Sequence, residues 1–115
     1  MKYLNTLIFA ITACACSFAS AQATLGVSAA IVSRVITYDG AAGTTQVWIW
    51  LNSNSRVGPN PANASVTCEL WTFNRNIHAT ALTAMLSGKK VDVQYADNSS
   101  GSFWCKVQSI SLLNE

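Results

Sequence analysis

One segment with helical periodicity lies among segments that alternate with the period of a β-strand. Apolar side chains recur at helical spacing from Ile77 to Leu86, with Asn76 as an N-cap and Gly88 as a C-terminal stop. Alternating segments precede it at 22–38, 46–52 and 66–73, and follow it at 90–95 and 103–113. The predicted order is therefore three strands, one helix and two strands.

This order is that of the OB-fold, a mainly β, five-stranded and partly open barrel. A small β-sandwich is the competing fold, and the lone central helix argues against it. A change of phase near Ser33 predicts a bulge or bend in the first strand. Glycines at 39–43 predict a turn, and the segment 52–64, which holds both prolines, predicts a loop.

Two cysteines fall on strands that are neighbours in such a barrel. Cys68 lies in the predicted third strand and Cys105 in the predicted fifth. In an exported chain an oxidising compartment favours a disulfide between them. Metal ligation or a reactive thiol is disfavoured, because no histidine or further cysteine lies near either residue in the sequence.

The first 21 residues have the pattern of a secretory signal peptide. Lys2 precedes an apolar run at 4–13, and small residues lead to Ala21. The run is shorter than the about 18 residues of a membrane span. We expect cleavage after Ala21, a single mature domain over 22–115, no membrane span, and a secreted or periplasmic bacterial protein. The alternatives are a buried N-terminal helix and lipidation at Cys14.

Charged residues are few. The chain carries seven Lys and Arg against five Asp and Glu, and removal of Lys2 lowers its net charge from +2 to +1. Nucleic-acid binding rests largely on phosphate neutralisation, so this balance predicts no nucleic-acid partner. A surface so poor in charge is typical of one partly covered by other subunits.

The sequence lacks an obvious catalytic constellation. His78, the one histidine, falls on the apolar side of the predicted helix and is interpreted as a packing residue. Glu69 and Asp92 lie on different predicted strands, and no phosphate loop or nucleophile elbow is present. We therefore expect no enzyme, no metal site and no cofactor.

Tryptophans mark the candidate ligand face. Trp48 and Trp50 alternate with the aliphatic residues of 46–52, and Trp71 has the equivalent position on the next strand. Strands two and three form the face on which OB-folds bind oligonucleotides and oligosaccharides. The rings would contact a ligand, another subunit, or loops of their own chain. The candidate ligand-binding residues are Trp48, Trp50, Trp71, Tyr38, Asp39, Thr44 and Gln46.

The polar stripe of the predicted helix is a second candidate surface. Thr80, Thr83 and Ser87 are small enough for the close approach of another element. They therefore form a candidate oligomer or pore surface, and the alternative is an ordinary, weakly polar helix surface.

The C-terminal half carries a family resemblance. The segment 77–95 (IHATALTAMLSGKKVDVQY), the Phe103–Lys106 stretch around Cys105, and Ile110–Leu112 resemble small exported bacterial proteins related to the B subunits of pertussis-type and subtilase-type toxins. The resemblance implies OB-fold domains in rings of five, with helices lining the pore. It also implies binding to cell-surface glycans and a separate catalytic subunit as a potential partner.

One departure limits this resemblance. Sialic-acid-binding members carry a Ser and a Tyr shortly before a cysteine, whereas Ser33 and Tyr38 have no such cysteine. No glycan contact is therefore carried over. The expected function is a non-catalytic carbohydrate-binding subunit of an exported homopentamer. The alternative is a monomeric periplasmic or secreted OB-fold protein that binds or inhibits a protein partner.

Overall fold

A computed structural model describes residues 23–40, 44–98 and 100–114. The predicted signal peptide at 1–21, with its cleavage site and Cys14, lies outside the described residues. Within the described part of the chain, no helix is both long enough and apolar enough to cross a membrane.

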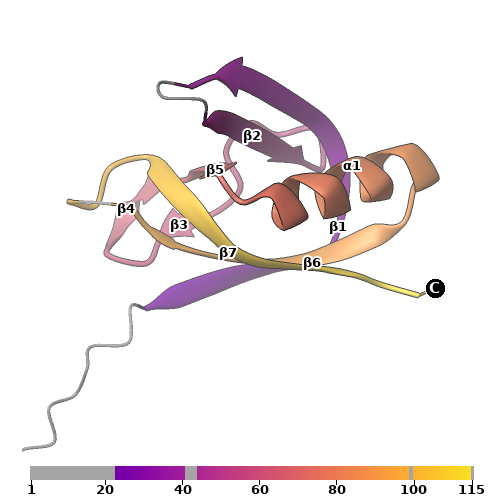
Figure 1. Cartoon of the computed structure of the whole chain (residues 1–115). Coiled ribbons are helices and arrows are strands. Elements are labelled where there is room, and N and C mark those ends of the chain that lie inside the picture. The colour runs from indigo at the N-terminus through magenta and orange to yellow at the C-terminus, as the bar shows by residue number, and fades with distance from the viewer. Residues whose placement is uncertain (1–22, 41–43, 99, 115) are drawn as a thin grey trace, which may run out of the picture.

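Five strands close a barrel with an OB-fold order. Around the barrel these are β1 (Thr24–Asp39), β2 (Thr45–Leu51), β5 (Glu69–Thr72), β7 (Trp104–Leu112) and β6 (Lys90–Asp97), which returns to β1. β5 and β7 run parallel, and the other neighbours run antiparallel. Helix α1 (Arg75–Ser87), the one helix in the described part of the chain, connects β5 to β6 and packs against β1 and β7 (Figure 1). The predicted fold class is confirmed.

The long strand β1 pairs with two different strands of the barrel. Its first part pairs with β6 and its second part with β2, and bulges fall between Val27 and Ala30 and between Val32 and Arg34. The second bulge is the one predicted near Ser33. The first was not predicted. There Ala29 has a positive φ of 49°, and its amide donates to Oδ1 of Asp92 at 2.8 Å.

The segment predicted as a loop contains a small sheet. The strands β3 (Pro59–Asn60) and β4 (Asn63–Thr67) pair antiparallel there. The predicted third strand at 66–73 is accordingly split at Cys68 into β4 and β5. The reason is backbone pairing, because the Cys68 amide donates to the Gly58 carbonyl at 2.7 Å.

Strand alternation fills the barrel with the predicted aliphatic side chains. Val47, Ile49 and Leu51 are buried, and Ala81 and Ala84 of α1 pack against the same cluster. Burial of apolar surface at roughly 25 cal/mol per Å² makes this set the main stabilising element of the domain.

Helix α1 begins earlier than predicted. Its N-cap is Asn74, whose side chain accepts from the amides of Asn76 and Ile77. Asn76 therefore lies inside the helix, because the side chain of Asn74 already accepts hydrogen bonds from the free amides of the first turn. Gly88 ends the helix in the left-handed region, as predicted. Leu86 is 83% exposed, so the apolar face is narrower than its sequence pattern indicates.

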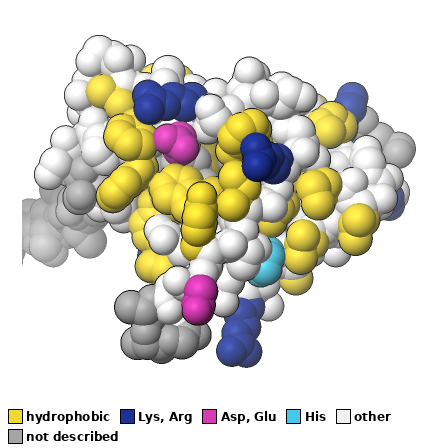
Figure 2. Space-filling view, turned by 90° about the horizontal axis from the view of Figure 1, so that it is seen from above, with side chains coloured by type: hydrophobic (Ala, Val, Ile, Leu, Met, Phe, Trp, Pro, Cys, Tyr) yellow, Lys and Arg dark blue, Asp and Glu magenta, His cyan; other side chains and the backbone are white. Residues whose placement is uncertain are grey.

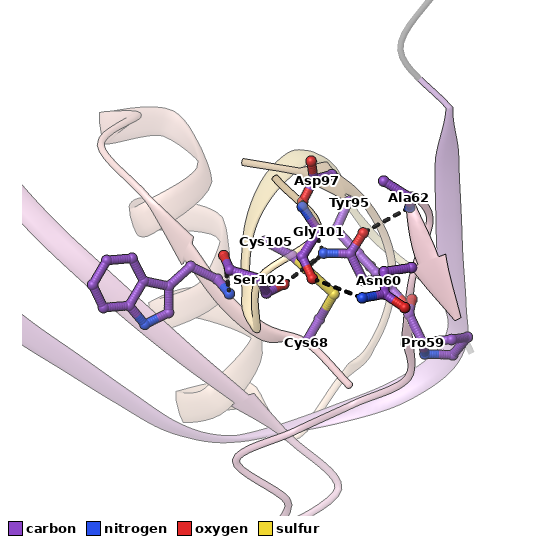
Figure 3. The surroundings of a disulfide bond; sticks show 11 residues. Pro59, Asn60, Ala62, Cys68, Tyr95, Asp97, Gly101, Ser102 and Cys105 are labelled. Atoms are coloured by element: carbon purple, nitrogen blue, oxygen red, sulfur yellow. Dashed lines mark hydrogen bonds between the residues drawn. A yellow bond between two sulfur atoms is a disulfide. The ribbon is translucent and has the colours of Figure 1, made fainter. Parts of the chain in front are cut away.

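The predicted disulfide joins Cys68 to Cys105 at a sequence separation of 37. Closure of a loop of this length stabilises a fold by about 3–4 kcal/mol in the chain-entropy account. Beside the disulfide, the buried side chain of Asn60 donates to Oδ1 of Asp97 and to the Ser102 carbonyl (Figure 3). These bonds fasten β3 to the barrel.

Tyr95 of β6 makes a further hydrogen bond between the barrel and β3. It is buried, and its hydroxyl donates to the Pro59 carbonyl at 3.0 Å. Burial raises the pKa of this hydroxyl above its ordinary value of 10.0. The folded state thus retains a proton that the unfolded state releases, so stability is full below about pH 10 and falls as the pH rises toward the folded pKa.

We therefore predict two effects of Tyr95→Phe. The variant should lose about 1–2 kcal/mol of unfolding free energy at pH 8, since the Pro59 carbonyl loses its donor. Its stability should also fall less steeply than that of the parent protein above pH 10. Denaturant melts between pH 8 and 11 check both effects. Parallel curves for the two proteins would contradict the assignment.

Candidate functional site

Most of the aromatic residues that the structure describes point outward from four barrel strands. We call the aromatic face the outer surface formed by Tyr38, Trp48, Trp50, Trp71 and Trp104. Trp48 on β2 pairs in register with Trp71 on β5, and Glu69 pairs with Trp104 on β7. Paired residues of neighbouring strands project to the same side of a sheet. Because side chains alternate between the two faces of a strand, the aliphatic residues point into the barrel and these rings point outward.

The aromatic face is hollowed into a groove of about 450 Å³. Hydrophobic side chains gather over the middle of the surface seen from above, with basic and acidic side chains beside them (Figure 2). The Trp48 and Trp104 rings meet edge to face, with centroids 6.2 Å apart. The groove is lined by Ile36, Tyr38, Gln46, Trp48, Trp50, Glu69 and Trp104.

Trp71 lies on the aromatic face as the in-register partner of Trp48, but it does not line the groove. The residue is 7% exposed, and its ring meets Phe73 edge to face at 4.8 Å, with Nζ of Lys106 5.8 Å from its centroid. Its buried Nε1 has no hydrogen-bond partner among the described residues. Trp71 thus lies on the predicted face but is covered by its neighbours.

Two arginines lie over aromatic rings, one on the aromatic face and one over Phe103 beside it. The guanidinium of Arg34 lies 4.7 Å from the Trp50 ring centroid, and that of Arg56 lies 4.6 Å from the Phe103 centroid. Arg56 also approaches Oε2 of Glu69 at 3.9 Å, and both side chains are partly exposed. A long, solvated ion pair of this kind contributes little to stability, so both groups stay accessible to a ligand.

The predicted polar contacts divide into two pairs. Tyr38 and Gln46 pair across β1 and β2 and line the groove. Asp39 and Thr44 do not line it. Thr44 instead borders a separate hollow of about 200 Å³ beside Phe73 and Arg75.

One aromatic residue that lines the groove and one basic residue beside it were not among the predicted ligand contacts. Trp104 shares the outward parity of Lys106, opposite the buried Cys105 and Val107, and Arg34 shares the parity of Tyr38. Alternation alone would have placed both on the face. Trp104 meets Trp48 because β2 and β7 flank β5 in the barrel, whereas Arg34 is the in-register partner of Trp50 across β1 and β2.

The hydroxyl groups of the stripe predicted as a pore surface donate hydrogen bonds to carbonyls of their own helix. The hydroxyls of Thr80 and Thr83 donate to the carbonyls four residues earlier, both at 2.9 Å, and Ser87 donates to the Ala84 carbonyl. Hydroxyls bonded in this way offer few free donors to a neighbour.

Titratable groups are dispersed. Asp92 accepts from the Ala29 amide on the β1–β6 side, whereas Glu69 lies on the aromatic face, and His78 is half-buried on α1. Among the described residues, no three His, Cys, Asp or Glu side chains are grouped so as to hold a metal ion.

The chain matches no protein-family model and no curated protein sequence. A comparison with solved structures matched a mitochondrial single-stranded DNA binding protein from S. cerevisiae, which is 14% identical. The match covers 81% of this chain and 95% of that chain, with a TM-score of 0.49. At this identity it assigns no ligand to the present chain.

These findings correct the function predicted from the sequence. The comparisons with family models, curated sequences and solved structures give the toxin resemblance no support, and the structure matched is that of a single-stranded DNA binding protein. The corrected predictions are the glycan-binding subunit, its ring of five, its catalytic partner, the protein-binding or inhibitor alternative, and the secreted or periplasmic location.

The exclusion of nucleic acid is corrected as well. It rested on net charge, whereas three of the seven Lys and Arg side chains lie on aromatic rings of this one region. Local placement of charge, which the total does not describe, decides what a surface can bind.

The exposures of the indoles predict an order of chemical reactivity. Limited oxidation with N-bromosuccinimide should modify Trp104, which is 48% exposed, well before Trp71. Peptide mass spectrometry measures the order, and the unfolded protein, in which both residues should react alike, is the control. Equal rates in the folded protein would contradict the described burial of Trp71.

Proposed function

We propose that the aromatic face binds single-stranded nucleic acid by stacking unpaired bases on its exposed rings. The observation that carries this proposal is the groove itself, whose walls are indole and phenol rings with guanidinium groups alongside. Proteins that bind single strands combine aromatic platforms with basic groups that follow the backbone.

The groove suits unpaired bases in particular. Bases in a duplex already stack on one another, whereas those of a single strand leave their faces free for aromatic side chains. Tyr38, Trp48, Trp50 and Trp104 together provide such platforms on the face that OB-folds use for oligonucleotides.

Stacking should supply more of the affinity than charge. Each stacked base contributes about 1–3 kcal/mol by alanine substitution. Arg34, Arg56 and Lys106 would neutralise at most about three phosphates, which corresponds to a salt slope of roughly −2 on a single strand. We therefore expect a modest dependence on salt and a strong dependence on the rings.

Binding without catalysis is part of this proposal. Glu69 is the one carboxylate that lines the groove, and His78 and Asp92 do not. Two-carboxylate acid–base chemistry needs a second titratable group placed beside the first. Among the described groove residues, no other carboxylate, histidine or cysteine supplies one.

Removal of one platform should weaken binding. Trp48→Ala should raise the dissociation constant for a short labelled oligothymidylate about tenfold or more, since a stacked base is lost. Fluorescence anisotropy measures the constant. Trp48→Phe should retain part of the affinity, and Leu86→Ala on the exposed side of α1 should retain all of it. An unchanged constant in a folded Trp48→Ala variant would contradict the proposal.

The salt dependence tests the basic groups separately. Arg34→Gln should reduce the slope of log K against log salt by about 0.7, the value for one phosphate contact on a single strand. Lys89→Gln is the matched control, because Lys89 is exposed between α1 and β6 and lines none of the groove. Equal slopes for the two variants would show that Arg34 meets no phosphate.

A further inference from the structure

Glu69 is an unusual member of the aromatic groove. It is the only charged residue among the groove-lining set, and it lies on β5 between β2 and β7, whose Trp50 and Trp104 line the same hollow. Its in-register partner on β7 is Trp104. A carboxylate surrounded by rings is costly to desolvate unless a bound group donates hydrogen bonds to it.

The carboxylate has room for such donors. Its only described side-chain partner is Arg56, at 3.9 Å, which is beyond hydrogen-bond distance. Its own side chain is 29% exposed. No described side chain donates a hydrogen bond to either oxygen, so the carboxylate can accept from a group bound in the groove that it lines.

We propose that Glu69 selects guanine among the bases that the aromatic face stacks, an inference that rests on the proposed function. An ionised carboxylate only accepts hydrogen bonds, and its two oxygens suit two parallel donors. Guanine presents two adjacent donors, N1–H and N2–H, on its Watson–Crick edge. These would meet both oxygens of Glu69 while the base lies between the rings.

The other bases match the carboxylate less well. Cytosine and adenine each offer one amino donor next to a ring nitrogen that accepts, and this acceptor would face the second oxygen. Thymine and uracil offer a single N–H between two carbonyl groups. Gln46 lines the same groove, and its amide can donate to guanine O6.

The test uses the full chain and four short thymidylate strands that carry a central guanine, cytosine, adenine or thymine. Fluorescence anisotropy gives the four dissociation constants. The guanine strand should bind at least about fivefold more tightly than the thymine strand, in line with the discrimination of one bidentate contact. Glu69→Gln should abolish this preference, so that the dissociation constants of the guanine and thymine strands for this variant lie within about twofold of each other.

A matched control separates local from general effects of charge. Asp92→Asn removes one carboxylate from β6, outside the groove, and its amide oxygen can still accept from Ala29. The guanine preference should survive in this variant.

The outcomes distinguish the inference from the function on which it rests. Equal constants for all four strands, with binding still dependent on Trp48, would overturn guanine selection and leave the proposed function standing. A preference for guanine that survives Glu69→Gln would also overturn it. Absence of binding to every strand would overturn both proposals. The comparison of strands on the unaltered protein needs no variant to fold.

Discussion

Strand β1 hydrogen-bonds to β6 along its first part and to β2 along its second, and this shared strand closes the barrel. Closure requires a sharp change of direction, which the two bulges and the Ala29–Asp92 bond provide. Once the register is fixed, the period of two determines both surfaces. The inward positions of β2 hold Val47, Ile49 and Leu51, so its outward positions hold Trp48 and Trp50. The same strand register therefore determines both the residues of the core and those of the aromatic face.

The features of this fold that follow from regular sequence patterns could be predicted from the sequence. Strand order, the inward aliphatic set and the disulfide pairing all follow from alternation and from the order of elements. The hydrogen bonds that the turn-rich segment 52–64 makes with the barrel could not. Asn60 lies in a segment rich in turn-forming residues, and only the fold reveals that its amide reaches Asp97 and Ser102. The break at Cys68 likewise depends on a bond to Gly58.

The candidate site shows the same division. Trp48 and Trp50 were predicted from alternation, and Tyr38 and Gln46 from their places beside the first turn; all four line the groove. Trp71 has the predicted parity but is covered, because Phe73 and Lys106 lie against its ring. The total charge of +2 gave no indication that arginines would lie on the rings of one region. Charge and aromatic rings meet there through strand pairing, as Arg34 and Trp50 do across β1 and β2, and the net charge does not report pairing.

The central claim is that the aromatic face receives the bases of a single strand, and the indole N–H resonances of the four tryptophans test it most directly. In a nitrogen-15 correlation spectrum titrated with a short single-stranded oligonucleotide, the indole signals of Trp48, Trp50 and Trp104 should shift together. Backbone signals of α1 should stay in place. Shifts confined to α1, or a spectrum unchanged at saturating oligonucleotide, would contradict the account.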